Sequence, residues 1–313
     1  MSHRVINRTE MHDAVLDLGG EPIDLSEYAT TGLIAVAIGP KGYGKTNAGL
    51  LIAEQLSEQG WVCVLIDPEG ELESLYGEAV KDKEELTERL TKRDRKIVVV
   101  SAKDAAQFVP YGQAIFDAAD KYRKPLMVVV DEGQLFSGSK KSDIAEASRL
   151  INDFAERGRK RALDLFITAT RFTGTLNRSL FAMKNITLFS CLEDPSAWAA
   201  IAPQFKASKI EFADLNALAP GEFYCFSRRG VDKIRMPMAR ALAKVAKKAK
   251  PVKRQLPSTF SQWDTAMSNI PVERLQALDK PEITNLLGAI AGLNPQQMIS
   301  GQRALHDEME IRK

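Results

Sequence analysis

The sequence has little histidine, and none of it lies in the body of the chain. Among 313 residues the histidines are His3, His12 and His306, all close to a chain end. An imidazole inside the fold is what histidine-based catalytic triads and most zinc–histidine sites need. The composition therefore argues against both classes. It leaves carboxylates, lysine, arginine, hydroxyls and the backbone to carry any chemistry.

Cysteine is equally scarce. Cys63, Cys191 and Cys225 lie far apart in sequence, each within an apolar run. Isolated cysteines of this kind usually serve as small hydrophobic side chains on buried strands, in proteins of a reducing compartment. We expect no disulfide scaffold, and a chain of this length can bury a sizeable core without one.

Long apolar runs and net charge are also missing. No window approaches the roughly 18 to 20 apolar residues that a membrane-spanning helix requires, and the N-terminal segment has no signal-peptide core. We therefore expect a cytoplasmic protein without a membrane partner. The formal net charge is only +2, so any binding to nucleic acid must depend on a local basic surface.

Between positions 32 and 191, short β-branched runs alternate with longer amphipathic stretches. Strands that are apolar on both faces and separated by helices predict an α/β three-layer domain with a mostly parallel sheet. After Pro220 the pattern favours an antiparallel hairpin that closes the sheet. The expected strands are 33–38, 62–66, 97–100, 127–130, 165–169, 186–191, 222–227 and 231–236, and the most evident helices are 46–59, 83–92 and 142–159.

One stretch matches a phosphate-binding pattern. Residues 39–46, GPKGYGKT, fit G-x-x-x-x-G-K-[ST] and lie between a predicted strand and a predicted helix. Glycines let the backbone wrap around a phosphate with its N–H groups pointing inward, and the helix adds the positive end of its dipole. Lys45 would reach the β- and γ-phosphates, and the Thr46 hydroxyl would bind Mg²⁺. The predicted ATP-binding residues are Gly39, Pro40, Lys41, Gly42, Tyr43, Gly44, Lys45, Thr46 and Asn47.

A second apolar run, LMVVV at 126–130, ends in the adjacent carboxylates Asp131 and Glu132. Such a strand end places Asp131 within reach of the magnesium ion held by Thr46, and directs Glu132 to the place where water would attack the γ-phosphate. The pair predicts hydrolysis, with Glu132 as the catalytic base. The simpler alternative, in which the carboxylates only cap the next helix, stays open at this point. The loop DPEGE at 67–71 would open beside the nucleotide, although strand ends are rich in polar residues whatever their function.

These motifs in this order resemble the HerA/FtsK branch of P-loop ATPases, which are hexameric DNA translocases related to conjugation and viral packaging motors. The resemblance covers about 32–236. It implies a RecA-like core at 31–239, an N-terminal arm at 1–30 in place of the barrel usual in HerA proteins, and a basic helix, linker and small helical region at 240–313. The segments that carry it are the P-loop, DPEGE at 67–71, DEGQ at 131–134, ERGRK at 156–160, ATR at 169–171 and LEDP at 192–195.

The resemblance also implies roles for individual residues. In that family each subunit lends an arginine to its neighbour's γ-phosphate, and the motif match places this role on Arg159, with Arg157 second. A solvated basic helix end is the other interpretation of these two residues. The γ-phosphate sensor falls on Thr170 or Arg171, where the family commonly has glutamine, and Gln134 stands where the DEAH motif has histidine.

The leading hypothesis is a hexameric, ATP-hydrolysing translocase of double-stranded DNA that serves a partner nuclease or effector. Basic segments at 138–141, 171–178 and 244–254 would supply sequence-independent phosphate contacts. Two alternatives remain: a nucleotide-dependent scaffold that assembles and activates a partner, and a viral-type genome packaging ATPase. A small-molecule kinase is least favoured, because the Asp131–Glu132 pair suits hydrolysis.

Overall fold

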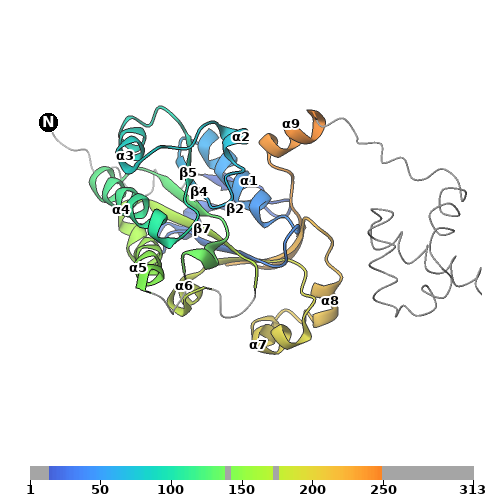
Figure 1. Cartoon of the computed structure of the whole chain (residues 1–313). Coiled ribbons are helices and arrows are strands. Elements are labelled where there is room, and N and C mark those ends of the chain that lie inside the picture. The colour runs from blue at the N-terminus through green and yellow to red at the C-terminus, as the bar shows by residue number, and fades with distance from the viewer. Residues whose placement is uncertain (1–13, 138–141, 172–175, 249–313) are drawn as a thin grey trace, which may run out of the picture. The chain divides into compact units, whose positions relative to one another are not determined.

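The computed structural model describes residues 14–137, 142–171 and 176–248 (Figure 1). They belong to the first of two compact units, Met1–Ala249. The second unit, Lys250–Lys313, lies outside the described residues. The predicted DNA-contacting segment 138–141, and parts of the predicted segments 171–178 and 244–254, also lie outside them.

An eight-stranded sheet forms the centre of the described unit, with strand order β10-β9-β8-β3-β7-β6-β4-β5. Strands β3 to β8 are parallel to their neighbours, and the hairpin β9–β10 joins β8 in the antiparallel sense. The predicted α/β class, the mostly parallel sheet and the closing hairpin are thereby confirmed. The strands are β3 Ile34–Ile38, β4 Val62–Asp67, β5 Ile97–Ser101, β6 Leu126–Val130, β7 Leu163–Ala169, β8 Ile186–Phe189, β9 Glu222–Ser227 and β10 Gly230–Arg235.

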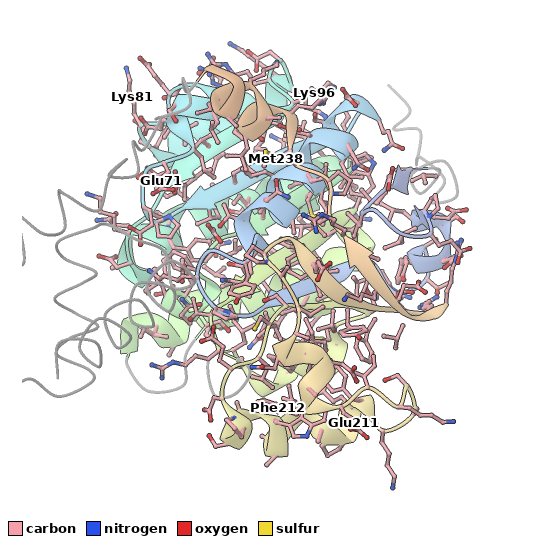
Figure 2. The ribbon with its side chains drawn as sticks, turned by 90° about the vertical axis from the view of Figure 1, so that its right-hand side faces the viewer. Glu71, Lys81, Lys96, Glu211, Phe212 and Met238 are labelled. Carbon is pink, nitrogen blue, oxygen red and sulfur yellow. The ribbon has the colours of Figure 1, made fainter. Side chains whose placement is uncertain are left out.

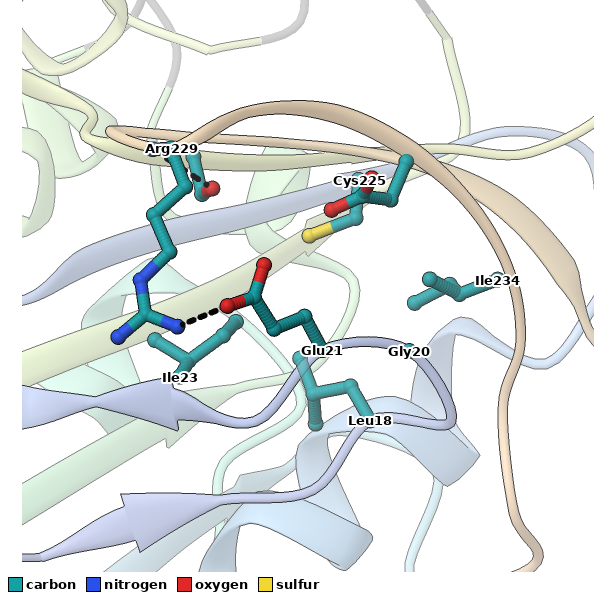
Figure 3. Close-up of a pocket in the computed structure, with 9 residues that line it drawn as sticks. Leu18, Gly20, Glu21, Ile23, Cys225, Arg229 and Ile234 are labelled. Carbon is teal, nitrogen blue, oxygen red and sulfur yellow. Dashed lines mark hydrogen bonds and ion pairs between the residues drawn. The ribbon is translucent and has the colours of Figure 1, made fainter.

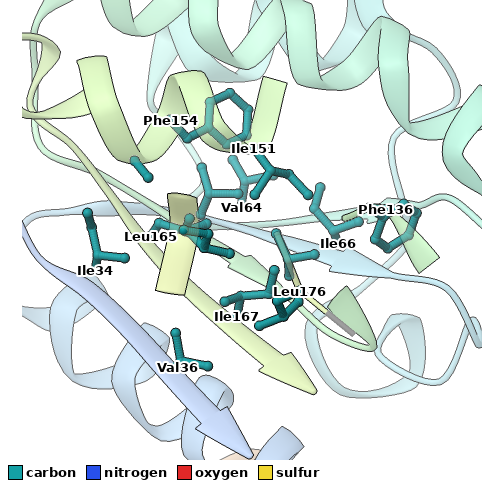
Figure 4. Packing of buried hydrophobic residues seen from close by; sticks show 14 of the residues in the cluster. Ile34, Val36, Val64, Ile66, Phe136, Ile151, Phe154, Leu165, Ile167 and Leu176 are labelled. Atoms are coloured by element: carbon teal, nitrogen blue, oxygen red, sulfur yellow. The ribbon is translucent and has the colours of Figure 1, made fainter. Parts of the chain in front are cut away.

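Two apolar cores, one on each face of the sheet, create the three layers. Successive residues of β3 enter different cores, Val36 the first and Ala37 the second. Because side chains alternate across a strand, a sheet covered on both faces needs apolar residues at every position. Figure 4 shows Ile151 and Phe154 in the first core, close to Leu165 of the sheet. Helices α3 (Lys83–Lys92), α4 (Ala105–Tyr122) and α5 (Ser142–Arg157) cover that face, and α1 (Lys45–Glu58) covers the other (Figure 1).

Helix α4 is the long element that the sequence pattern does not single out, because Pro110 lies inside it. Proline removes an amide donor and clashes with the preceding turn. The helix forms nevertheless, since the Asp104 carboxylate caps it by accepting a 2.9 Å hydrogen bond from the Gln107 N–H. Phe108 and Ile115 are also fully buried in the core that α4 shares with α5. Tertiary packing here outweighs local propensity.

Helix α5 ends before the position that the sequence pattern predicts. The α-helix stops at Arg157, and Gly158–Arg161 form a 3-10 turn, η4. A Cβ on Gly158 would lie 2.6 Å from the Leu163 carbonyl oxygen, so the chain approaches the start of β7 too closely for any other residue. Arg159 therefore lies in the turn ahead of β7, and the expected helix end at 159 is wrong.

The described part of the N-terminal arm packs against the hairpin. Leu25 and Tyr28 are fully buried in the core beside α1. At the hairpin turn, the Arg229 guanidinium donates a 2.8 Å hydrogen bond to the Glu21 carboxylate of the arm (Figure 3). It also donates a 2.7 Å hydrogen bond to the Glu27 carboxylate of the arm. The arm therefore braces the outer edge of the sheet. Its elements are β1 Val15–Leu16, β2 Ile23–Asp24 and the 3-10 turn η2 Leu25–Tyr28.

The remaining elements are short. The predicted basic helix begins at Arg240 as α9, and its Leu242 packs against the core beside α1. Figure 2 shows Phe212 at the start of α8 and Met238 on the segment that joins β10 to α9. Within the described ranges, no helix is long and apolar enough to cross a membrane. The short elements are α2 Glu73–Tyr76, the 3-10 turn η3 Gly133–Leu135, α6 Arg178–Met183, α7 Pro195–Phe205, α8 Phe212–Asn216 and α9 Arg240–Lys248.

Candidate nucleotide-binding site

The phosphate-binding pattern forms the turn from β3 into α1. Helix α1 begins at Lys45, and its N-cap Gly44 has φ 93°, with no side chain capping the first turn. The first N–H groups of α1 therefore face the loop without side-chain partners, which is the arrangement that binds anions. A Cβ on Gly39 would lie 1.6 Å from the Ser190 hydroxyl oxygen, so close packing against the residue after β8 requires glycine there.

The side chain of Lys45 folds back over this loop. It is only 6% exposed, and its Nζ donates a 2.8 Å hydrogen bond to the Pro40 carbonyl oxygen. Burial lowers the pKa of Lys45, while the nearby carboxylates of Glu132 and Asp131 act in the opposite direction. A poorly solvated ammonium at this position favours an anionic ligand in the loop.

Asp131 connects α1 to β7 through both of its carboxylate oxygens. The Thr46 hydroxyl donates a 2.9 Å hydrogen bond to Oδ2, and the Thr168 hydroxyl donates a 2.6 Å hydrogen bond to Oδ1. Mg²⁺ prefers oxygen ligands and is usually held by one or two protein groups together with phosphate oxygens and water. A threonine hydroxyl in direct contact with a carboxylate, beside the phosphate loop, fits this ion. Thr46 would bind it directly and Asp131 through water.

Glu132 follows in a strained backbone conformation. Its φ of 48° and ψ of 46° are left-handed, a region that non-glycine residues occupy at a cost of roughly 1 to 3 kcal/mol. Its N–H donates a 2.9 Å hydrogen bond to the Thr168 hydroxyl oxygen, and the Gln134 amide nitrogen donates to its carboxylate. A Cβ on Gly133 would lie 2.3 Å from a side-chain carbon of Ile167. The turn from 131 to 134 is therefore fixed against β7.

The acidic loop after β4 is organised around Asp67. This carboxylate is 3% exposed, and it accepts hydrogen bonds of 3.2, 3.0 and 2.7 Å from the N–H groups of Glu69, Gly70 and Leu72. Asp67 therefore braces its own loop. Glu69 and Glu71 are exposed.

Thr170 follows β7 at the same edge of the sheet as the P-loop. The Gly39 N–H donates a 3.1 Å hydrogen bond to the carbonyl oxygen of Ala169, so Thr170 is one residue beyond this junction and is half-buried. Arg171 is exposed. Residues 172–175 lie outside the described part of the chain.

Arg157 and Arg159 lie ahead of β7, at the amino ends of the parallel strands and opposite the P-loop. The Arg159 guanidinium donates to the Thr30 carbonyl oxygen, on the segment that precedes β3. Arg157 pairs with Asp153 at 3.2 Å and lies 4.7 Å from the ring centre of Phe116. The seven residues of β7 run between the two ends of the sheet. At about 3.3 Å per residue, the separation between these ends is roughly 20 Å. Neither arginine reaches Lys45 of its own chain.

Two further predicted binding residues contact the rest of the fold. The Asn47 side chain donates to the Pro237 carbonyl oxygen at 2.9 Å and accepts from the Ala239 N–H at 2.8 Å, which ties the chain after β10 to α1. A side-chain hydrogen bond with Cys191, together with burial, raises the pKa of Tyr43 to about 12.

Thr168 is the site residue that sequence reasoning missed. It is 1% exposed and touches both Asp131 and the backbone of Glu132, whereas the sequence pattern favours Thr170 or Arg171 as the polar group at this strand end. The signal was a hydroxyl near the carboxyl end of a strand whose other residues, apart from Asp164, are apolar. Using it requires the β6–β7 register, in which Val130 pairs with Ile167 and Asp131 consequently stands next to Thr168.

The described chain has the α/β fold of RecA-like P-loop NTPases, with the phosphate-binding pattern at the carboxyl ends of its parallel strands. No protein-family model matches the chain, and no curated protein matches it by sequence. Solved structures do match. The genome packaging NTPase B204 from Sulfolobus turreted icosahedral virus 2, in complex with AMPPCP, superposes with a TM-score of 0.52 at 18% identity, over 66% of this chain and 98% of its own.

Two other solved structures match at similar TM-scores. The pCW3 conjugation coupling protein TcpA has a TM-score of 0.52 at 15% identity, over 80% of this chain and 73% of its own. Thermomonospora curvata EccC, in complex with a signal sequence peptide, has a TM-score of 0.50 at 14% identity, over 76% of this chain and 43% of its own. At these identities the likeness establishes the fold. It agrees with the resemblance to FtsK/HerA-type ATPases that the motifs carry.

Proposed function

We propose that this chain is an ATP-hydrolysing motor of the DNA-translocase kind that works as a ring in the cytoplasm. The observation that carries the proposal is one cluster at the carboxyl edge of the sheet. Lys45, Thr46, Asp131 and Glu132 meet there, and Thr168 ties the two acidic residues to β7. Phosphoryl transfer to water needs this set: a cation for the phosphates, oxygens for a metal ion, and a base for the water.

Each residue then has a defined task. The phosphates of ATP lie in the loop 39–46, where Lys45 exchanges its hydrogen bond to Pro40 for contacts with the β- and γ-phosphates. Glu132 accepts a proton from the attacking water, and Thr170 contacts the γ-phosphate. Mg²⁺, when bound at Thr46 and Asp131, neutralises charge that develops on the phosphate oxygens. A small-molecule kinase is less favoured, because the adjacent carboxylates of Asp131 and Glu132 suit hydrolysis.

The position of the arginines supports a ring. Arg159 and Arg157 lie at the end of the sheet opposite the P-loop, so either of these two arginines could act on a γ-phosphate only in a neighbouring subunit. A closed ring, with six subunits as the expected number, gives every site such a neighbour. Double-stranded DNA is the proposed substrate, and a nuclease or effector is the proposed partner.

Native mass determination tests the ring and its ligands together. We expect assembly with a non-hydrolysable ATP analogue, and an ATPase rate that rises with duplex DNA. Lys45→Ala should abolish nucleotide binding, whereas Glu132→Gln should bind ATP without turnover. A protein that hydrolyses ATP at a rate indifferent to DNA and stays monomeric contradicts the motor.

One observation favours the scaffold as a second candidate. The Glu54 carboxylate of α1 is 5% exposed and accepts hydrogen bonds from the N–H groups of Arg240 and Ala241 at 2.6 and 2.9 Å. The helix that carries Lys45 and Thr46 therefore caps α9, the last described helix before the C-terminal unit. If the ATP-locked Glu132→Gln protein still activates the partner, assembly and not translocation is the function.

A further inference from the structure

We propose that Met238 is the contact surface for the base of the bound nucleotide. The inference deepens the proposed function and rests on it, because it assigns the part of the ligand that the P-loop pattern does not address. Met238 lies on the segment between β10 and α9 (Figure 2).

The first observation is an apolar side chain that its surroundings do not cover. Met238 is 57% exposed, the largest exposed fraction among the large hydrophobic residues of the described chain. Its neighbours behave differently, since Met236 is 7% exposed and Ala239 is fully buried. The segment is thus anchored in the core on both sides of Met238 while this one long side chain points outward.

The second observation is that the segment is held at the P-loop by two independent routes. Asn47 bonds the backbone on both sides of Met238, at Pro237 and at Ala239. In addition, the Met236 N–H donates 2.8 Å to the Gly221 carbonyl oxygen, and the Gly221 N–H donates 3.2 Å to the Tyr43 carbonyl oxygen inside the P-loop. Met238 is therefore fixed relative to the phosphate site.

A third contact supports the segment from behind. A Cβ on Gly19 of the N-terminal arm would lie 2.1 Å from the Arg235 carbonyl oxygen and 3.0 Å from a ring carbon of Pro237. The arm consequently leaves no space into which the segment could retreat. A ligand that presses on Met238 meets a supported surface.

The direction of the ligand places its base at this surface. The terminal phosphate belongs near Lys45 and Glu132, so the triphosphate runs from there toward the first N–H groups of α1 at Thr46 and Asn47. The ribose and base must leave the loop beside Asn47, which is the residue that holds Met238 in place. A thioether is polarisable and packs favourably on aromatic rings. The contact selects a flat ring, and ATP therefore gains affinity that inorganic tripolyphosphate lacks.

The test compares these two ligands by calorimetry on the full-length chain, without requiring hydrolysis. Met238→Ala should weaken ATP binding by about 5- to 20-fold and change tripolyphosphate binding by less than about 2-fold, because only the base contact is lost. Met238→Leu should stay close to wild type. Val245→Ala is the matched control, since Val245 is an exposed aliphatic residue on α9 with 49% exposure, and it should change neither affinity.

A second variant reports the contact directly. In Met238→Trp, indole fluorescence should change on addition of ATP and stay constant with tripolyphosphate. Equal affinities of wild type for the two ligands, or equal losses for both in Met238→Ala, overturn the base contact and leave the phosphate site intact. A wild-type protein that binds neither ligand overturns the proposed function itself.

Discussion

Replacing Thr168 by valine removes one hydroxyl and almost no volume from the centre of the site. In the folded chain this hydroxyl donates to Asp131 at 2.6 Å and accepts from the Glu132 N–H at 2.9 Å, at a position that is 1% exposed. A hydrogen bond to a charged group contributes about 1.5 to 3 kcal/mol and a neutral one about 1 kcal/mol. Asp131 and Glu132 are half-buried, so water restores part of the loss. We expect Thr168→Val to lower the free energy of unfolding by about 2 to 3 kcal/mol.

The same change should affect catalysis more than binding. Without the hydroxyl, Asp131 loses one of its two orienting partners and the strained backbone of Glu132 loses its hydrogen bond. Misplacement of a catalytic group by a fraction of an ångström lowers the rate with little effect on affinity. Turnover should fall at least about 10-fold, while the affinity for ATP, set mainly by the P-loop, should change less than about 3-fold.

Thr168→Ser is the matched control, because it keeps the hydroxyl and removes only a methyl group, worth about 0.8 kcal/mol. Urea unfolding of the nucleotide-free protein gives the free energy of unfolding. Steady-state kinetics give the turnover, and separate binding measurements give the affinity for ATP. A valine variant that is as stable and as active as the serine variant would refute the role assigned to Thr168.

Three further predictions address other parts of the molecule. Arg159→Ala should keep its own ATP affinity but lose turnover. Adding Lys45→Ala subunits, whose Arg159 is intact, should restore activity in mixed rings. Unchanged turnover in Arg159→Ala would contradict an arginine that acts on the neighbouring subunit. Glu54→Leu leaves the N–H groups at the start of α9 without their acceptor, so stability should fall by about 2 to 4 kcal/mol and limited proteolysis should cut near α9, whereas Glu58→Leu on the exposed side should not produce the cut. Because folding lowers the pKa of Lys45, its ammonium is less favourable in the folded chain than in the unfolded one. Lys45→Met should therefore raise the free energy of unfolding of the nucleotide-free protein near pH 7. This gain in stability should shrink as the pH rises through the pKa of Lys45 in the folded chain. A Lys45→Met protein that is less stable than wild type at pH 7 would contradict the prediction.

The sequence could locate those parts of the fold whose signals are local. Strands such as 62–66 and 126–130 are continuous apolar runs, and the glycine spacing of 39–46 constrains the backbone within one turn. The sequence pattern did not predict helix α4, because Pro110 interrupts the local pattern. Only the packing of α4 against α5 shows why the helix tolerates this proline. The end of α5 shifted for a related reason, since Gly158 is required by contact with Leu163 across a chain reversal.

What the sequence by itself determined is therefore the α/β class, the phosphate loop and the pair of carboxylates, since each is written in neighbouring residues. The tertiary structure alone decided which groups stand beside them. Thr168 meets Asp131 across 37 residues of sequence, and Asn47 holds Pro237 across 190. Arg159 and Lys45 of one chain lie at opposite ends of the parallel strands, although both belong to one set of motifs. Such placements depend on strand order and register, which arise from the burial of the whole sheet and leave no signature in a short stretch of sequence.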